Sequence, residues 1–189
     1  MSTDLTVRSR RRVKTTLAEL ERTFGSIDIV EDEWSLSTDR YDTTVDRFEA
    51  GTVGGAGAWI RNDDGEVLLV QQEDGDNEQD VWSDPGGKQE PGETLPETAL
   101  REVREEAGIV AQLDGVGFAE IIDVSDRERN ARPPLVRLIV VFTAEYVEGT
   151  PTPADGEITD VRWWSKKPDE LRYEALNQLN VPAESADRS

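Results

Sequence analysis

Cysteine and histidine are both absent from this chain of 189 residues. Without cysteine the protein has no disulfide, no thiolate metal site and no cysteine nucleophile. Without histidine it has no serine–histidine–aspartate triad, no histidine-bound zinc and no access to the commonest general base. Any catalysis must therefore use carboxylates, Lys, Arg, Tyr, Ser or Thr, or a metal ion bound by oxygen atoms.

Long apolar runs are also missing, and no segment approaches the roughly 18 apolar residues that a membrane span requires. The N-terminal segment is basic but lacks the apolar centre of a secretion signal. We therefore expect a cytoplasmic protein with no membrane partner. Hydrophobic residues make up 35% of the chain, which is enough to bury the core of one domain with an extension.

Positive charge is scarce, because 41 acidic residues face 21 basic ones and the formal net charge is -20. Only four residues are lysines, at positions 14, 88, 166 and 167. This composition resembles that of proteins from salt-accumulating halophiles, an origin that we favour over an acidic protein from a mesophile. Molar salt shortens the screening length to about 3 Å, so the like charges would be screened there. The same charge disfavours binding to a nucleic acid backbone, and we expect no nucleic-acid partner.

Hydrophobic periodicity and turn residues predict a mixed order of strands and helices rather than a regular βαβ alternation. Residues 62–65 form a turn signal between two strands, which predicts a hairpin. Residues 73–80 read as an acidic loop, and residues 183–189 as a flexible tail. The predicted helices are 10–24, 39–50, 95–107 and 168–180, and the predicted strands are 27–36, 52–61, 66–72, 118–125, 135–147 and 161–164.

The helix predicted over 95–107 has clear signals at both ends. Thr94 and Glu97 have the spacing of a capping box, with a proline between them. Gly108 is a natural helix stop. Within the helix, Glu102, Glu105 and Glu106 lie at i, i+3 and i+4, so their carboxylates converge on one surface.

Three convergent carboxylates raise one another's pKa values unless a cation lies among them. Hard divalent cations such as Mg²⁺ prefer such oxygen ligands, together with water and substrate phosphates. The competing interpretation is a solvated helix face with i, i+4 ion pairs such as Arg101–Glu105. The turn Pro85-Gly86-Gly87 precedes the helix, and its bare backbone allows close approach to an ion or a phosphate.

At this point the sequence resembles the Nudix hydrolases, whose signature is G-x5-E-x7-R-E-U-x-E-E-x-G-U with U aliphatic. Every specified position matches between Gly87 and Ile109, including Glu93 and Arg101. The resemblance implies an α/β/α sandwich, of the α+β class, around a mixed sheet in residues 51–182. Residues 1–50 would then be an N-terminal extension of helix, strand and helix that either packs on the domain or mediates homodimerisation.

The resemblance also implies roles for individual residues. Glu102, Glu105 and Glu106 would ligate Mg²⁺ or Mn²⁺, with the carbonyl of Gly86 as a further ligand. Arg101 would orient a glutamate, and Glu93 would support the loop or an outer metal. In several members a glutamate before a late strand acts as base or ligand; Glu157 occupies a comparable place, and Glu120 is a weaker rival. The general base is left open among Glu105, Glu106 and Glu157.

The implied reaction is hydrolysis of a nucleoside diphosphate linked to another moiety, so the partner is a small nucleotide. ADP-ribose and nucleoside diphosphate sugars are slightly favoured over nucleoside triphosphates. Trp82 and Arg137 are the candidates for contact with the substrate, whereas core packing is expected for most other tryptophans. The competing class is a non-catalytic Nudix-fold module that binds a nucleotide and regulates a partner; a third is an acidic metal-binding domain.

Overall fold

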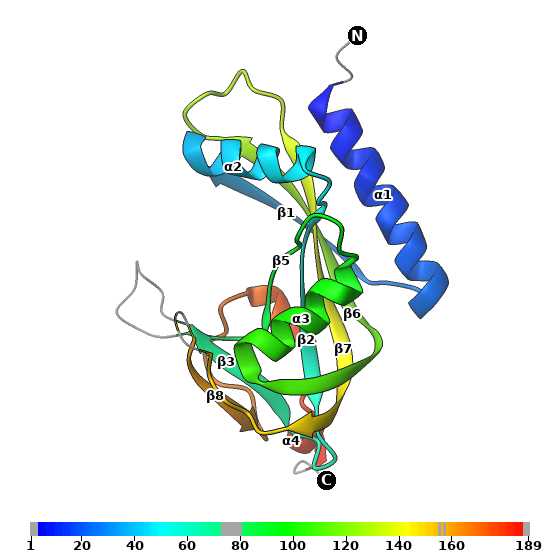
Figure 1. Ribbon diagram of the computed structural model, residues 1–189, viewed down its shortest axis with the longest axis vertical. Helices are drawn as coiled ribbons and strands as arrows, with labels where there is room; N and C mark the ends of the chain where they lie inside the picture. The colour runs from blue at the N-terminus through cyan, green and yellow to red at the C-terminus, as the bar shows by residue number, and fades with distance from the viewer. Residues whose placement is uncertain (1–3, 73–80, 155, 157, 187–189) are drawn as a thin grey trace.

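The computed structural model describes residues 4–72, 81–154, 156 and 158–186. The predicted acidic loop 73–80 and Glu157 therefore lie outside the described residues. The elements in chain order are α1 (Leu5–Phe24), β1 (Ile29–Leu36), α2 (Thr38–Glu49), β2 (Gly54–Arg61), β3 (Val67–Gln72), β4 (Val81–Ser83), β5 (Gly86–Lys88), α3 (Leu95–Ala107), β6 (Ile109–Asp126), β7 (Leu135–Gly149), β8 (Ile158–Trp164), the 3-10 helix η1 (Glu174–Gln178) and α4 (Pro182–Ala186) (Figure 1).

One mixed sheet of eight strands organises the molecule, with the order β1-β6-β7-β2-β3-β4. β1 runs parallel to β6, and β2 runs parallel to β7, whereas β6 and β7 are antiparallel. One edge of β2 is shared: β5 pairs with its first half and β3 with its last two residues. The predicted β2–β3 hairpin is therefore confirmed, but it is short. β3 and β5 diverge along this edge of β2, and the turn between β4 and β5 lies between them.

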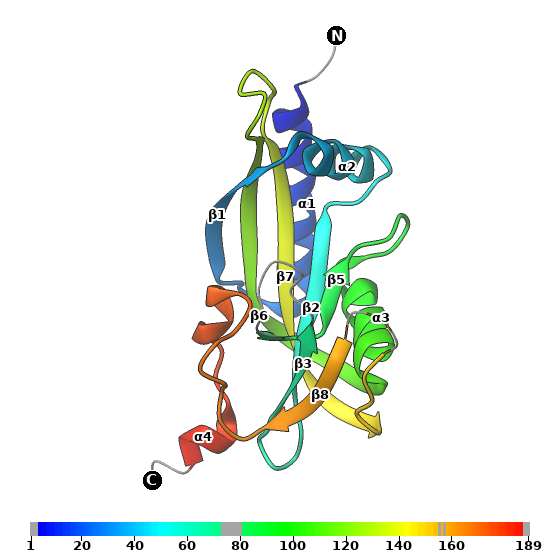
Figure 2. The same ribbon diagram turned by 90° about the vertical axis from the view of Figure 1, so that its left-hand side faces the viewer.

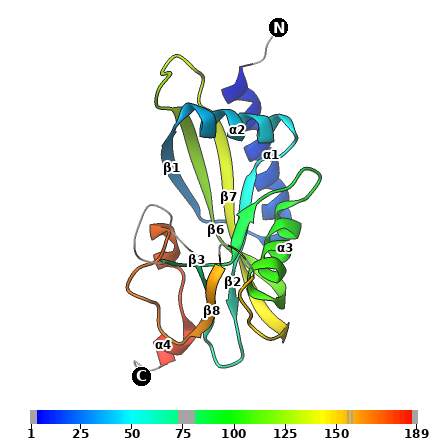
Figure 3. The same ribbon diagram turned by 60° about the vertical axis from the view of Figure 1, so that its left-hand side comes forward.

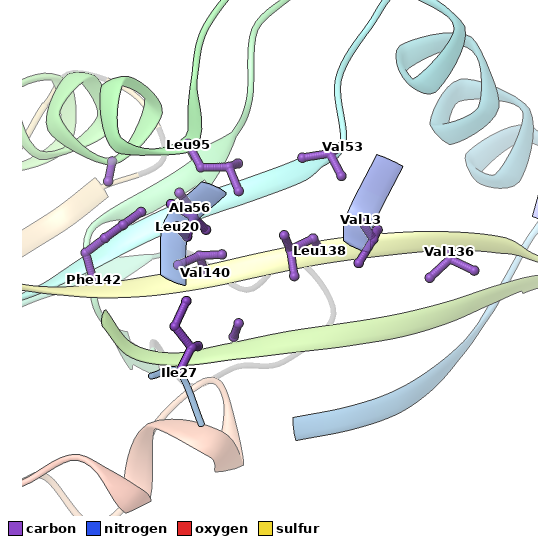
Figure 4. Close-up of a cluster of buried hydrophobic side chains, with 12 residues drawn as sticks. Val13, Leu20, Ile27, Val53, Ala56, Leu95, Val136, Leu138, Val140 and Phe142 are labelled. Atoms are coloured by element: carbon purple, nitrogen blue, oxygen red, sulfur yellow. The ribbon is translucent and has the colours of Figure 1, made fainter. Parts of the chain in front are cut away.

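Alternation along the central strands divides the core between two faces of the sheet. On one face, Leu138 and Val140 of β7 pack with Val13 and Leu20 of α1 and with Leu95 of α3 (Figure 4). The intervening residues of β7 face the opposite side, where α2 and the C-terminal segment lie. Figure 3 shows α1 and α3 on the side of the sheet opposite the C-terminal segment. The structure thus confirms a mixed sheet between helical layers.

The N-terminal extension is built into this sheet rather than appended to it. β1 adds a strand at the β6 edge, pairing from Ile29 to Leu36. The basic start of α1 meets the end of α2: Arg8 pairs with Glu49, and Arg12 donates to the carbonyl of Phe48 at 2.6 Å. These arginines are therefore paired with an acid and a helix end. Whether the extension also mediates dimerisation stays a prediction.

The helix predicted over residues 168–180 is wrong. Of this segment only Glu174–Gln178 is helical, as η1, and Leu171 instead forms a bridge with Trp82. The Arg172 amide donates to the Trp82 carbonyl at 2.8 Å, a bond that a helix would not allow. Leu176 and Leu179 of this segment nevertheless lie in the core. Tertiary hydrogen bonds to β4 outweigh the local helical preference here.

Two further expectations concern the ends of the chain and the membrane. The expected tail overlaps α4, so its residues 183–186 form helix, and residues 187–189 lie outside the described part. Among the described residues, no helix has both the length and the apolarity needed to cross a membrane.

Candidate active site

Helix α3 spans the residues predicted from the sequence. It carries the acidic signature and packs where β5 pairs with β2. The Thr94 hydroxyl accepts from the Glu97 amide, and the Glu97 carboxylate accepts from the Thr94 amide at 2.7 Å, which completes the capping box. Gly108 ends the helix in the left-handed region, with φ of 69°. Ala99 and Val103 are fully buried, so the glutamates are held on the flank of a fixed helix.

Arg101 neutralises three of the acids in the signature. Its guanidinium donates to Glu93 at 2.7 Å, to Glu102 at 2.8 Å and to Glu105 at 2.9 Å. Its fourth partner is the Lys88 carbonyl, at 3.0 Å, and this hydrogen bond joins the helix to β5. Hydrogen bonding to Arg101 lowers the pKa of Glu93 to about 2. The Arg101–Glu105 ion pair of the solvated-face interpretation is thus present, within a larger network.

Glu106 has no cationic partner among the described residues and is held instead by neutral donors. Its carboxylate accepts from the Gly86 amide at 2.8 Å and from the Gln72 side-chain amide at 3.2 Å. Burial raises its pKa to about 8, and Glu102 and Asp84 push the pKa in the same direction. A carboxylate in this state is stabilised in its charged form by a cation.

Glu102 lies against the glycine turn on the other side. Only 12% of its side chain is exposed, and burial raises its pKa. A Cβ at position 87 would lie 2.4 Å from Glu102 Oε1, so the close approach of this carboxylate to the turn requires Gly87. Glu105 differs, because 60% of its side chain is exposed.

The donor set fits a hard divalent cation, because it consists of carboxylates, two of them with pKa values raised by burial. In the geometry described, however, Glu102 and Glu105 turn toward Arg101, and the described residues contain no ready-made group of three metal-ligating side chains. The amide of Gly86 binds Glu106, whereas the expected role of its carbonyl stays a prediction. Metal binding would require the glutamates to exchange some of these partners.

Sequence reasoning missed four residues that the fold brings to this site. Asp84 is buried beside Ser83, and burial raises its pKa to about 6. Arg172 donates to Gln72 at 2.9 Å, and Gln72 in turn donates to Glu106. Tyr173 is near enough to Asp84 and Glu106 for their charges to raise its pKa, although burial is the larger cause. Only Asp84 carried a sequence signal, its position before the glycine turn; the others come from distant segments.

A cleft of about 730 Å³ opens beside the Gly86–Gly87 turn. Its floor is the face of the sheet between α2 and the C-terminal segment, which Figure 2 shows at opposite ends of the strands. The extension contributes a wall through β1 and one residue of α2. Among the lining residues are Trp34, Arg40, Glu120, Arg137, Arg172 and Tyr173.

The candidate substrate contacts divide into one inside the cleft and one outside it. Arg137 lines the cleft. Trp82, contrary to expectation, is a buried core residue. Its ring packs edge-to-face with the ring of Trp164, and the two ring centroids are 4.9 Å apart. Its neighbours Ser83 and Asp84 line the cleft in its place. Glu120 also lines the cleft and is half-buried, while Trp59 is buried as expected.

Comparison with known proteins covers most of this chain. A family model described as "NUDIX domain" matches residues 51–182. "Nucleoside diphosphate-linked moiety X motif 6" of Xenopus laevis is 47% identical over 57 residues, 30% of this chain and 25% of that protein. "NAD-capped RNA hydrolase NudC" of Pseudomonas aeruginosa is 37% identical over 86 residues, 45% of this chain and 27% of that protein. The chain thus spans only about a quarter of these curated relatives.

Solved structures show the same fold. A MutT NUDIX hydrolase from Burkholderia pseudomallei is 26% identical with a TM-score of 0.50, covering 67% of this chain and 96% of that one. A NUDIX hydrolase from Nitrosomonas europaea is 19% identical with a TM-score of 0.52, covering 73% and 74%. At these identities the likeness concerns the fold.

Proposed function

The chain belongs to the Nudix family, and from that premise we propose that it hydrolyses the pyrophosphate bond of a nucleoside diphosphate linked to another moiety, with Mg²⁺ or Mn²⁺ as cofactor. The observation that carries the proposal is the placement of Glu102 and Glu106. Both carboxylates contact the Gly86–Gly87 turn, and this turn lines the cleft. One curated relative is named as a hydrolase, and another is named after nucleoside diphosphate-linked moieties.

In this proposal Glu102, Glu105 and Glu106 hold the metal, with the Gly86 carbonyl as a further ligand. When bound, the ion would neutralise phosphate charge and lower the pKa of a bound water. The chain must supply the rest of the chemistry. Arg101 keeps Glu102 and Glu105 in place by charge-assisted hydrogen bonds, and Gln72 and the Gly86 amide do the same for Glu106.

The attacking water must lose its proton to a carboxylate, since the chain has no histidine. We infer that Glu105 accepts it, because 60% of its side chain is exposed, whereas Glu102 and Glu106 are half-buried. The other two candidates are Glu106, which is more sheltered, and Glu157, which lies outside the described residues. Arg172, at the cleft wall beside Gln72, is placed to meet negative charge on the substrate.

The test is product analysis by mass spectrometry over a panel of nucleotides. ADP-ribose and UDP-glucose represent the favoured class, and dGTP the triphosphates. Each is incubated in high KCl with Mg²⁺, with Mn²⁺ or with EDTA. We expect two phosphorylated products from the diphosphate-linked substrates, formed only with metal. Saturable binding without cleavage of any substrate would instead favour the non-catalytic module.

A further inference from the structure

The guanidinium of Arg137 on β7 lacks a polar partner. Within the described part of the chain it forms no hydrogen bond and no ion pair, although the residue is only half-exposed. Every other described arginine either has a partner for its side chain or is exposed to solvent. A sheltered cation without a counterion costs free energy, and it is unexpected in a chain of net charge -20.

Glu120 also lines the cleft, but no ion pair joins it or any other described carboxylate to Arg137. Burial lowers the pKa of Arg137, the positive charge of Arg47 lowers it further, and only the Tyr173 phenol acts in the opposite direction. The guanidinium lies 6.0 Å from the centre of the Trp34 ring, which comes from β1 of the extension. A cation–π contact of this kind orients the guanidinium but leaves its N–H groups free to bind an anion.

Arg137 lies far along the cleft from the Gly86–Gly87 turn, which Glu102 and Glu106 contact. On β7, Val141 pairs with Gly57 of β2, and Gly57 pairs with Gly86. Arg137 precedes Val141 by four residues, an even number, so both side chains face the cleft. At about 3.3 Å per residue the separation along the strand is about 13 Å. That distance is longer than a pyrophosphate group and suits the far end of a moiety attached to it.

We propose that Arg137 binds a second anionic group, a phosphate or a carboxylate, on the moiety linked to the nucleoside diphosphate. This inference rests on the proposed function and narrows its substrate class to compounds whose linked moiety carries an anionic group in addition to the diphosphate. Arginine suits the task because its planar fork binds phosphate and carboxylate oxygens in pairs. Trp34 gives the extension a part in the site, because it holds the guanidinium in place from β1.

Matched substrate pairs test the proposal. ADP-ribose 1″-phosphate and ADP-ribose differ by one phosphate on the distal ribose, and UDP-glucuronate and UDP-glucose differ by one carboxylate on the sugar. We expect at least one charged member to be preferred by about tenfold in kcat/KM, through KM, because a charged hydrogen bond is lost in the neutral member. The pair that shows the preference identifies the anionic group.

Variants separate a binding role from a structural one. Arg137→Gln should remove the preference by raising KM for the charged member, and Arg137→Lys should retain part of the preference. Arg129→Gln, on an exposed loop outside the cleft, is the matched control and should retain the full preference. Thermal denaturation of each variant checks the fold.

Equal kcat/KM within both pairs, or a preference that survives in Arg137→Gln, would overturn the proposal while leaving the hydrolase function intact. The opposite failure is distinguishable as well. If calorimetry in EDTA shows tighter binding of the charged members that depends on Arg137, yet no metal supports cleavage, the anion subsite stands and the proposed function falls.

Discussion

At the residue scale, three neighbouring glutamates of the site differ in their exposure and in their hydrogen-bond partners. Glu105 is exposed and paired with Arg101. Glu102 is sheltered and shares the same arginine, whereas Glu106 is sheltered and accepts only from amides. Their spacing in the sequence does not distinguish the three glutamates. In the fold, Glu106 is the one whose charged form is destabilised by burial and has no cationic partner among the described residues, so a bound cation would stabilise it most.

Glu106→Gln should lower kcat by about 100-fold or more, because it removes a charge that we assign to metal binding. Glu105→Gln should also remove most of the turnover if it accepts the proton of the water. The measurement is steady-state hydrolysis at fixed salt and metal. Glu148→Gln, on an exposed end of β7, is the control and should keep full activity. Full activity in both site variants would contradict the assignment.

The raised pKa values of Glu106 and Asp84 predict a stability that falls with pH. The pKa is about 8 for Glu106 and about 6 for Asp84, above the ordinary 4.5 and 3.8 of these groups. Between the ordinary and the raised values the folded protein binds more protons than the unfolded chain. The free energy of unfolding must then decrease as pH rises from about 4 to about 8.

Scanning calorimetry in EDTA from pH 5 to pH 9 measures this dependence. We expect Tm to fall across the range, and Glu106→Gln to flatten the curve between pH 6 and pH 8 relative to the native chain. Saturating Mg²⁺ should do the same, since a bound cation stabilises the ionised carboxylate. A native curve that rises with pH in EDTA would contradict the burial of Glu106.

At the scale of the element, the placement of the glutamates depends on the ends of α3. Thr94 and Glu97 satisfy each other's backbone donors at its start, and Gly108 permits the left-handed turn at its end. The capping residues precede the acidic run and Gly108 follows it, and neither feature lines the substrate cleft. They therefore fix the helix, and through it the site.

Thr94→Ala should lower the free energy of unfolding by about 1 kcal/mol through loss of the N-cap. Urea denaturation followed by circular dichroism measures it. Thr43→Ala is the matched control: Thr43 is exposed inside α2 and bonds only to the carbonyl of Asp39. That change should have no destabilising effect, because alanine is the better helix former. Equal losses in both variants would show that the cap contributes nothing specific.

At the scale of the whole molecule, charge governs stability. The formal net charge is -20, and the ion pairs that offset it join elements such as α1 with α2 and β2 with β7. Unscreened repulsion among the remaining acids opposes the compact state. Halophilic origin stays a prediction from composition.

We expect Tm in EDTA to rise by several degrees as KCl increases from about 0.1 M to above 1 M, where the screening length falls to about 3 Å. Differential scanning fluorimetry gives the dependence. An equal osmolality of sucrose is the control, since it changes excluded solvent without screening charge. A Tm that is unchanged by KCl would remove the support for adaptation to high salt.

The sequence by itself determined most local structure and the identity of the acidic cluster. The periodicity, the capping box and Gly108 specified α3 to the residue, because these signals act over fewer than five neighbours. The signature identified the family, and the apolar pattern predicted helices and strands, although the helix over 168–180 was wrong. These features depend on contacts close in the chain.

Only the tertiary structure decided how distant segments meet. It placed Trp82 in the core, set Gln72, Asp84 and Tyr173 beside Glu106, and turned residues 171–173 along β4 instead of into a helix. It also brought Trp34 to Arg137 across about 100 residues of chain. The physical reason is that strand pairing and burial are summed over the whole sheet, and no window of neighbouring residues contains that sum.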